Sequence, residues 1–144
     1  MRNCSAVWPN SLVSKVEPDL FFLNTAQIDR IHSDQLENWG GRSGLRNENG
    51  LESAIAQPQN VYAYESSDLY ELAAAYAYHL AESQAYLDGN KRVGIQAALD
   101  FLEIHGIDTT PLPEQQTYQV MIGISAHKTR RSDLAAYFRS VLGN

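Results

Sequence analysis

The residues best suited to chemistry lie in one stretch near the middle of the chain, residues 84–92, which reads QAYLDGNKR. Gly89 has no Cβ atom, so it allows a tight turn and the close approach of a ligand to the main chain. A helix that starts here directs its first, unpaired N–H groups and the positive end of its dipole at whatever occupies the turn. The stretch therefore predicts an anion-binding site at the start of a helix.

The side chains of this stretch favour a nucleotide phosphate as the anion. Lys91 and Arg92 lie in the first helical turn, where cations oppose the helix dipole, and a bound phosphate would reverse that penalty. Asn90 can donate a hydrogen bond to a phosphate oxygen. Asp88 is a hard oxygen ligand that suits Mg²⁺ held jointly by one carboxylate and a nucleotide. The alternative is a capped helix with a common Asp-Gly-Asn turn and an exposed basic pair.

The composition of the chain argues against several classes of protein. The 144 residues fit one globular domain, and the formal net charge of −6 makes general nucleic-acid binding a poor expectation. The single cysteine, Cys4, allows no internal disulfide and favours a reducing compartment. No apolar run reaches the roughly 18 residues that a membrane span needs, and the N-terminus lacks the apolar core of a signal peptide. We therefore expect a cytoplasmic protein without membrane contact.

The elements that must position the stretch are predicted to be helices. Residues 1–19 contain Pro9 and Pro18 and show no sustained period, so we expect an N-terminal extension before an all-α domain at residues 20–144. Capping residues and breakers predict about six helices in this single domain. The first helix is expected at 25–39, and the second from after Asn47 to about Gln57, where Pro58 ends it. The third and fourth are expected at 67–83 and 89–105. A fifth helix ends near Ala126, and Ser132 caps the sixth.

The helix that follows residues 84–92 is expected to be the central helix of the domain. Its apolar residues make a broad surface: Ile95, Ala98, Leu99, Phe101 and Leu102. Such a helix can hold the anion site rigidly against the rest of the domain.

Residues 84–92 resemble the signature of the Fic/Doc family, which is His-x-Phe-x-Asp/Glu-Gly/Ala-Asn-Lys/Gly-Arg in a loop followed by a helix. From about Phe21 to the C-terminus, further pieces in the same order resemble the death-on-curing branch of that family. These pieces are Ile31-His32, Gly40-Gly41, Gly44-Leu45-Arg46, Leu51-Glu52-Ser53-Ala54, Pro58-Gln59-Asn60, Phe101-Leu102-Glu103 and Gly106.

The resemblance implies a helical Fic fold and the toxin role of a toxin–antitoxin pair, with a separate antitoxin as partner. Fic enzymes transfer AMP from ATP to a hydroxyl of a target protein. The death-on-curing branch resembles a protein kinase with a translation elongation factor as target. Two positions favour the kinase-like reaction: Lys91 stands where AMP-transferring members usually have glycine, and Ile95 stands where they often have a second arginine.

The resemblance also implies roles for single positions. Asp88 would hold Mg²⁺, and the phosphates of ATP or another nucleoside triphosphate would be held by Gly89, Asn90, Lys91 and Arg92. Residues 57–64, expected to be a loop, would match the flap that aligns a target segment by strand-like main-chain pairing. An ordinary packed loop is the alternative. The flap residues would be Pro58, Gln59, Asn60, Val61 and Tyr62.

One position departs from the family pattern, because Gln84 stands where the signature has its catalytic histidine. A glutamine side chain forms hydrogen bonds but cannot take a proton from a target hydroxyl. We therefore predict a chain that binds nucleotide but transfers slowly or not at all. A natural pseudoenzyme, an inactivating substitution and altered chemistry are all open explanations.

No other histidine is expected to replace the missing base. His79 lies one helical turn or more before Gln84, and the favoured interpretation is a histidine on a helix face with a structural partner. His32, His105 and His127 are distant in sequence and are given no role. Two other functions are compatible with the sequence: a non-catalytic Fic-fold module that binds an antitoxin or regulator, and a structural helical domain with an incidental turn.

Overall fold

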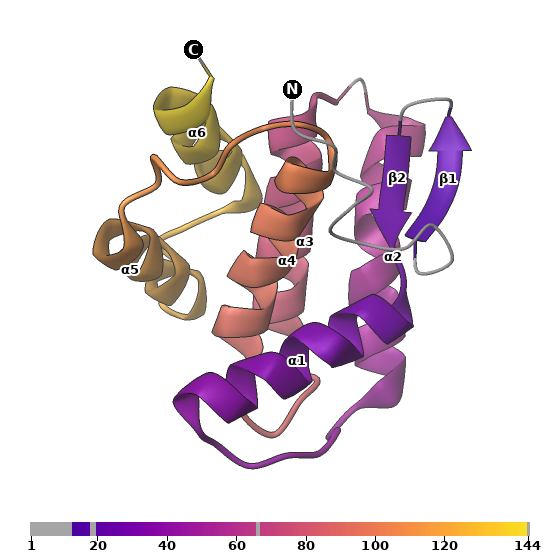
Figure 1. The fold of residues 1–144 in the computed structure, drawn as a ribbon, viewed down its shortest axis with the longest axis vertical. Helices are drawn as coiled ribbons and strands as arrows, with labels where there is room; N and C mark the ends of the chain where they lie inside the picture. The colour runs from indigo at the N-terminus through magenta and orange to yellow at the C-terminus, as the bar shows by residue number, and fades with distance from the viewer. Residues whose placement is uncertain (1–12, 18–19, 66, 144) are drawn as a thin grey trace.

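A computed structural model describes residues 13–17, 20–65 and 67–143, so Cys4 and most of the expected N-terminal extension lie outside the described residues. Over these ranges the chain forms six α-helices and one two-stranded antiparallel sheet (Figure 1). The elements are β1 (Val13–Glu17), β2 (Leu20–Leu23), α1 (Thr25–Trp39), α2 (Glu48–Tyr64), α3 (Leu69–Ser83), α4 (Asn90–Ile104), α5 (Glu114–Ser125) and α6 (Arg131–Leu142).

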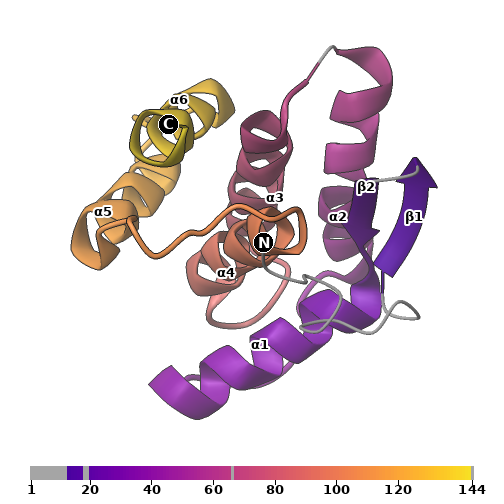
Figure 2. The same ribbon diagram turned by 45° about the horizontal axis from the view of Figure 1, so that its top comes forward.

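The predicted all-α domain is confirmed, and α4 lies at its centre as expected. α3 and α4 pack side by side, with α5 and α6 on one side and α2 with the hairpin on the other (Figure 2). α1 runs across the end of this pair where α4 begins (Figure 1). Buried alanines on α3 and Gly94 on α4 allow the close approach, since a Cβ on Gly94 would lie 2.6 Å from the Ala77 carbonyl oxygen.

Side-chain caps explain where the first three helices begin. Asn24 and Asn47 accept hydrogen bonds from main-chain amides of α1 and α2, and Asp68 forms a reciprocal capping box with Glu71 at the start of α3. The starts of α1 and α2 match the sequence-based prediction, and α3 begins at Leu69, two residues after the predicted start. The predicted cap Ser132 is wrong, because α6 begins at Arg131 and Ser132 lies inside the helix.

The prediction that Pro58 ends the second helix is also wrong. α2 continues through Pro58 to Tyr64. Proline within a helix removes one main-chain hydrogen bond and costs about 3 kcal/mol. Here Pro58 and Val61 are buried, and the Tyr62 ring packs 6.1 Å from the Phe22 ring. Burial of these side chains in the core offsets the local preference, and the loop expected at 57–64 is helical.

The hairpin was not expected from the sequence. β1 pairs with β2 from Val13↔Leu23 to Glu17↔Leu20, with an irregularity between Lys15 and Glu17. β2 is joined to the helices by two polar contacts: the Leu23 amide donates to the Tyr76 hydroxyl (2.7 Å), and the Phe21 amide donates to Nε2 of His105 (3.0 Å).

Membrane insertion was not expected. In the residues that the structure describes, no helix combines the length and the apolar character that crossing a bilayer requires.

Candidate functional site

The signature stretch lines a small pocket of about 250 Å³ between the end of α3 and the start of α4. The structure brings together Gln84, Asp88 and the first residues of α4 in one place. Tyr118 of α5 closes one side of the pocket. The full lining is Ala81, Gln84, Leu87, Asp88, Gly89, Asn90, Lys91, Arg92 and Tyr118.

The N-terminus of α4 is open. Gly89 precedes the helix in the left-handed region (φ +86°), which a residue with a side chain seldom adopts. No side chain caps α4, whereas side chains cap α1, α2 and α3. Unpaired N–H groups at a helix start attract anions. Because Lys91 and Arg92 line the same pocket, its chemistry suits a phosphate.

The Asp88 carboxylate is bound by Arg42, which lies in the segment after α1. The Arg42 amide donates to Oδ2 of Asp88 (2.7 Å), and Nε of Arg42 lies 3.5 Å from the same oxygen. The hydrogen bond from the Arg42 amide, with the nearby charges of Arg42 and Arg46, holds the pKa of the Asp88 carboxyl below its usual range. Asp88 is therefore an anion at neutral pH. Its side chain is 43% exposed.

The Asn90 side chain braces the loop. Its Oδ1 accepts a hydrogen bond from the Tyr86 amide (3.0 Å), and its Nδ2 donates to the Tyr86 carbonyl oxygen (2.9 Å). One side chain thus satisfies both main-chain groups of Tyr86. Only the second Nδ2 hydrogen is left for the phosphate contact that the sequence suggested.

We expect Asn90→Ala to destabilise the fold by about 1–3 kcal/mol, because the partly buried Tyr86 main chain loses both partners. Urea denaturation of the variant measures this. Asn38→Ala removes an exposed amide from α1 and should change the free energy of unfolding by less than about 0.5 kcal/mol. Equal effects of the two substitutions would rule out the brace.

His32, which the sequence analysis gave no role, lies directly against the signature loop. Its buried ring stacks on the Tyr86 ring, with centroids 3.7 Å apart, and Nε2 donates to the Asp88 carbonyl oxygen at 3.0 Å. The Tyr86 hydroxyl donates to Asp29 at 2.6 Å. Burial and this hydrogen bond raise the pKa of Tyr86, so its hydroxyl stays protonated. α1 therefore positions the loop, and the Ile31-His32 pair was the available signal.

An exposed extended segment, residues 40–47, runs beside the loop. The Arg46 and Asn47 amides both donate to the Ala85 carbonyl oxygen, at 2.6 and 3.0 Å, and Leu45 forms an antiparallel bridge with Tyr86. From the family resemblance we expected such main-chain pairing at residues 57–64. The expected loop is absent there, because those residues are helical and their main chain is used within α2.

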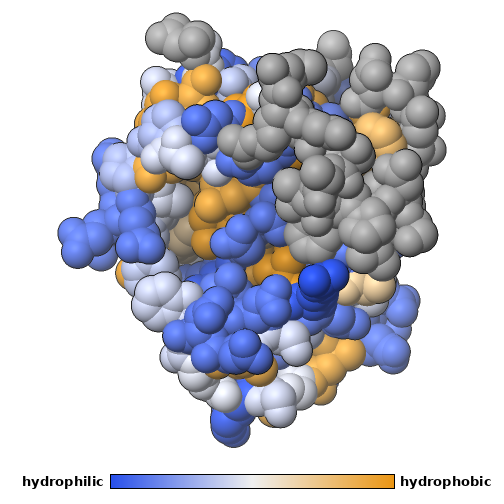
Figure 3. Space-filling model, viewed as in Figure 1, coloured by the Kyte–Doolittle hydropathy of each residue, from blue (hydrophilic) through white to orange (hydrophobic). Residues whose placement is uncertain are grey.

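A second, larger groove adjoins the signature pocket and shares Arg92 and Tyr118 with it. Its volume is about 1000 Å³, and it lies between the end of α1, the outer face of α4 and α5. In Figure 3, apolar surface is visible in the hollow between α4 and α5, while hydrophilic residues cover α1. Ile95, Leu99 and Leu112 are the aliphatic residues in its lining.

A model of the Fic/DOC family matches residues 22–102 of the 144 in this chain. The chain belongs to the Fic/DOC family. It is similar to the protein kinase doc of Escherichia phage P1, with 26% identity over 123 residues that cover 85% of this chain and 96% of the phage protein. It is also similar to the toxin Doc of Mycolicibacterium smegmatis, with 39% identity over 71 residues, 48% of this chain and 55% of that protein. The chain is thus a homologue of Doc toxins.

In this Fic/DOC chain, Gln84 ends α3 in the left-handed region, with φ +48° and ψ +38°. This backbone conformation is uncommon for a residue with a side chain, and strained residues of this kind cluster at functional sites. Gln84 lines the signature pocket beside Asp88. Gln84 therefore lies in the same pocket as Asp88 and the first residues of α4.

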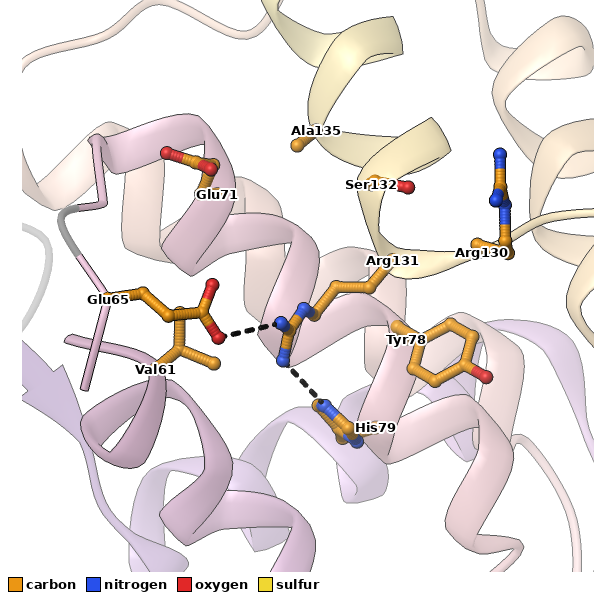
Figure 4. A pocket seen from close by; sticks show the side chains of 9 residues that line it. All are labelled: Val61, Glu65, Glu71, Tyr78, His79, Arg130, Arg131, Ser132 and Ala135. Atoms are coloured by element: carbon orange, nitrogen blue, oxygen red, sulfur yellow. Dashed lines mark hydrogen bonds and ion pairs between the residues drawn. The ribbon is translucent and has the colours of Figure 1, made fainter. Parts of the chain in front are cut away.

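His79 faces a different cavity (Figure 4). Nε2 of His79 lies 3.4 Å from Nη1 of Arg131, whose Nη2 is 3.1 Å from a Glu65 carboxylate oxygen. Burial and the Arg131 charge lower the pKa of His79. This cavity, of about 310 Å³, shares no lining residue with the signature pocket. His79 therefore has the structural partner that the sequence favoured and does not replace a base at Gln84.

Asp100 of α4 carries an unfavourable charge next to the groove. Nε2 of Gln96, a groove residue, donates to Asp100 at 2.8 Å. Burial raises the pKa of the Asp100 carboxyl from 3.8 to about 6, and the charge of Asp34 on α1 adds to the shift. Between these two pKa values the folded state binds more protons than the unfolded state, so Asp100 lowers stability as the pH rises from 4 to 6.

Asp100→Asn should therefore stabilise the protein above pH 6, by about 2–3 kcal/mol on the basis of the pKa shift. The gain should shrink as the pH falls and vanish near pH 4. Urea denaturation of both proteins across this range measures the difference. Glu37→Gln, at an exposed site on α1, is the matched control and should give no such trend. A gain that stays constant with pH would contradict the assignment.

Proposed function

We propose that this Fic/DOC chain is a Doc-like toxin scaffold that binds ATP and is built to transfer its γ-phosphoryl group to a hydroxyl of a target protein. The observation that carries the proposal is the open start of α4, where Lys91, Arg92 and Asp88 share one pocket. The name of the phage relative, a protein kinase, favours phosphorylation over AMP transfer. Lys91 and Ile95, at positions where AMP-transferring members differ, favour the same reaction.

The pocket fits a nucleotide with one divalent cation. The N–H groups of α4, Lys91 and Arg92 would receive the phosphates, and Asp88 would hold Mg²⁺. In the described part of the chain no cluster of three or more His, Cys, Asp or Glu residues could hold a metal by itself. Mg²⁺ would therefore be shared between Asp88 and the nucleotide. When bound, it would neutralise charge on the transferred group.

Gln84 is proposed to leave this site without its general base. The glutamine amide has no accessible pKa for taking a proton from a hydroxyl. Positioning and charge neutralisation account for much of phosphoryl-transfer catalysis, so a residual rate is expected. We infer that nucleotide binding is retained and that transfer is strongly slowed.

The proposed partners are an antitoxin and a protein target. The mycobacterial relative is named a toxin, and a Doc toxin has a cognate antitoxin. The exposed extended segment at residues 40–47 lies beside the signature loop, and its main chain is the better candidate to align a target peptide. A translation elongation factor is the target class that the family resemblance suggests.

A non-catalytic binding module is the second candidate function. The groove beside α4, with its aliphatic floor and the exposed Trp39 at its edge, favours it. Such a module would hold its partner equally well with and without ATP. A pull-down from host lysate, repeated with and without nucleotide, separates the two functions.

The donor group can be tested directly with Gln84→His. The variant is incubated with host extract and ATP labelled at either the γ- or the α-phosphate. Label transferred from the γ-position to protein supports phosphorylation. Label transferred only from the α-position would replace the kinase proposal with AMP transfer.

A further inference from the structure

Arg92 differs from four other arginines of the described residues in having no carboxylate partner. No carboxylate among the described residues pairs with it, and no described residue accepts a hydrogen bond from its guanidinium. Four other arginines form ion pairs with carboxylates: Arg42, Arg130, Arg131 and Arg139. A carboxylate partner neutralises a guanidinium and occupies its donors, whereas Arg92 keeps both its charge and its N–H groups available.

Two aromatic rings hold Arg92 instead. The guanidinium carbon lies over the Trp39 ring, 4.9 Å from its centroid, and over the Tyr118 ring, 5.6 Å from its centroid. Trp39 is the last residue of α1 and is 59% exposed, and Tyr118 of α5 is 37% exposed. Both distances are within the range of cation–π attraction. Helices on two sides of α4 thus contribute one ring each.

We propose that Trp39 and Tyr118 form an aromatic clamp that positions the Arg92 guanidinium for a nucleotide phosphate. The clamp acts on the ring-facing surfaces of the guanidinium and leaves its in-plane N–H donors free for the phosphate oxygens. It also restricts the rotamers of Arg92 before a ligand is bound, so less side-chain entropy is lost on binding. This inference deepens the proposed function and depends on it.

The location of the clamp supports a positioning role. Arg92 and Tyr118 line both the signature pocket and the adjoining groove, and Trp39 lines the groove only. Trp39 therefore reaches the anion site through Arg92, and its ring is not part of the pocket that would hold the phosphate.

The test measures the affinity of the full chain for ATP and for inorganic tripolyphosphate by titration calorimetry. Trp39→Ala and Tyr118→Ala should each weaken both ligands by about 3- to 30-fold, the range that cation–π energies imply. Trp39→Phe and Tyr118→Phe should retain affinity within about threefold. Tyr64→Ala, at an exposed tyrosine of α2 that is 86% exposed, is the control and should have no effect.

A double-variant cycle shows whether the rings act through Arg92. In an Arg92→Ala background, Trp39→Ala should have no further effect on tripolyphosphate affinity. Additive losses, or a loss for ATP without a loss for tripolyphosphate, would overturn the clamp and indicate contact between the rings and the nucleobase. Unchanged affinity in both alanine variants would also overturn it. Failure of the unmodified chain to bind either ligand would overturn the proposed function as well.

Discussion

Replacing Gln84 with histidine is expected to raise the rate of transfer to a target protein by about 10²–10⁴-fold, the usual contribution of a positioned general base. The reason is local. Gln84 lines the same pocket as Asp88, Lys91 and Arg92, so an imidazole there would be beside the proposed phosphate cradle. The measurement is label transfer from ATP to protein in host extract, together with growth of cells that express the variant.

Two control variants test whether the gain comes from the imidazole at position 84. Gln84→Asn keeps an amide at the same position and should leave the rate unchanged. Arg92→Ala added to Gln84→His should remove the gain, since the base has no bound donor to act on. If Gln84→His neither labels a protein nor slows growth, the transferase assignment loses its main support.

The second large effect is on nucleotide affinity. Arg92→Ala should weaken ATP binding by about 10- to 150-fold, which corresponds to the loss of hydrogen bonds between charged groups worth about 1.5–3 kcal/mol. Arg92 lines the signature pocket, and no carboxylate among the described residues neutralises it. Titration calorimetry of the variant and the unmodified chain gives the ratio.

Arg130→Ala is the control for Arg92→Ala because it removes the same charge from a residue that lines the other cavity and pairs with Asp133. It should leave ATP affinity within about twofold. An equal loss in both variants would mean that ATP responds to the overall charge of the protein and not to a site at α4.

Much of the fold could be predicted from local signals. The first helix spans Thr25–Trp39 as expected, because Asn24 caps it and Gly40 ends it. The capping box of Asp68 and Glu71 fixed the start of α3, and the apolar face of α4 indicated its central place. These signals are strong because a few neighbouring residues determine them.

Predictions failed where contacts distant in sequence overrule the local preference. Pro58 is an unfavourable residue inside a helix, yet burial of Pro58 and Val61 in the core keeps α2 helical to Tyr64. The hairpin also went unpredicted, because short strands give little periodic signal and β2 is fixed by Tyr76 and His105 from distant helices.

The candidate site was predicted only in part, because some of its residues are neighbours in sequence and others are distant. Residues 84–92 are contiguous, so their types and order were enough to suggest a phosphate site. Partners from elsewhere in the chain were missed: His32 against the Asp88 carbonyl, Arg42 on the Asp88 carboxylate, and Trp39 on Arg92. The Ile31-His32 pair was a signal for the first of these contacts, and no local pattern in the sequence marks the other two. Asn90 was expected to donate to phosphate, and the structure shows it bracing Tyr86.

The most direct test of the central claim is titration of the unmodified chain, with Gln84 in place, with ATP and Mg²⁺. The claim is that the start of α4 is a nucleotide-phosphate site that persists without a general base. We predict binding of one ATP per chain, with a dissociation constant in the millimolar range or tighter. Absence of binding at millimolar ATP would contradict the claim.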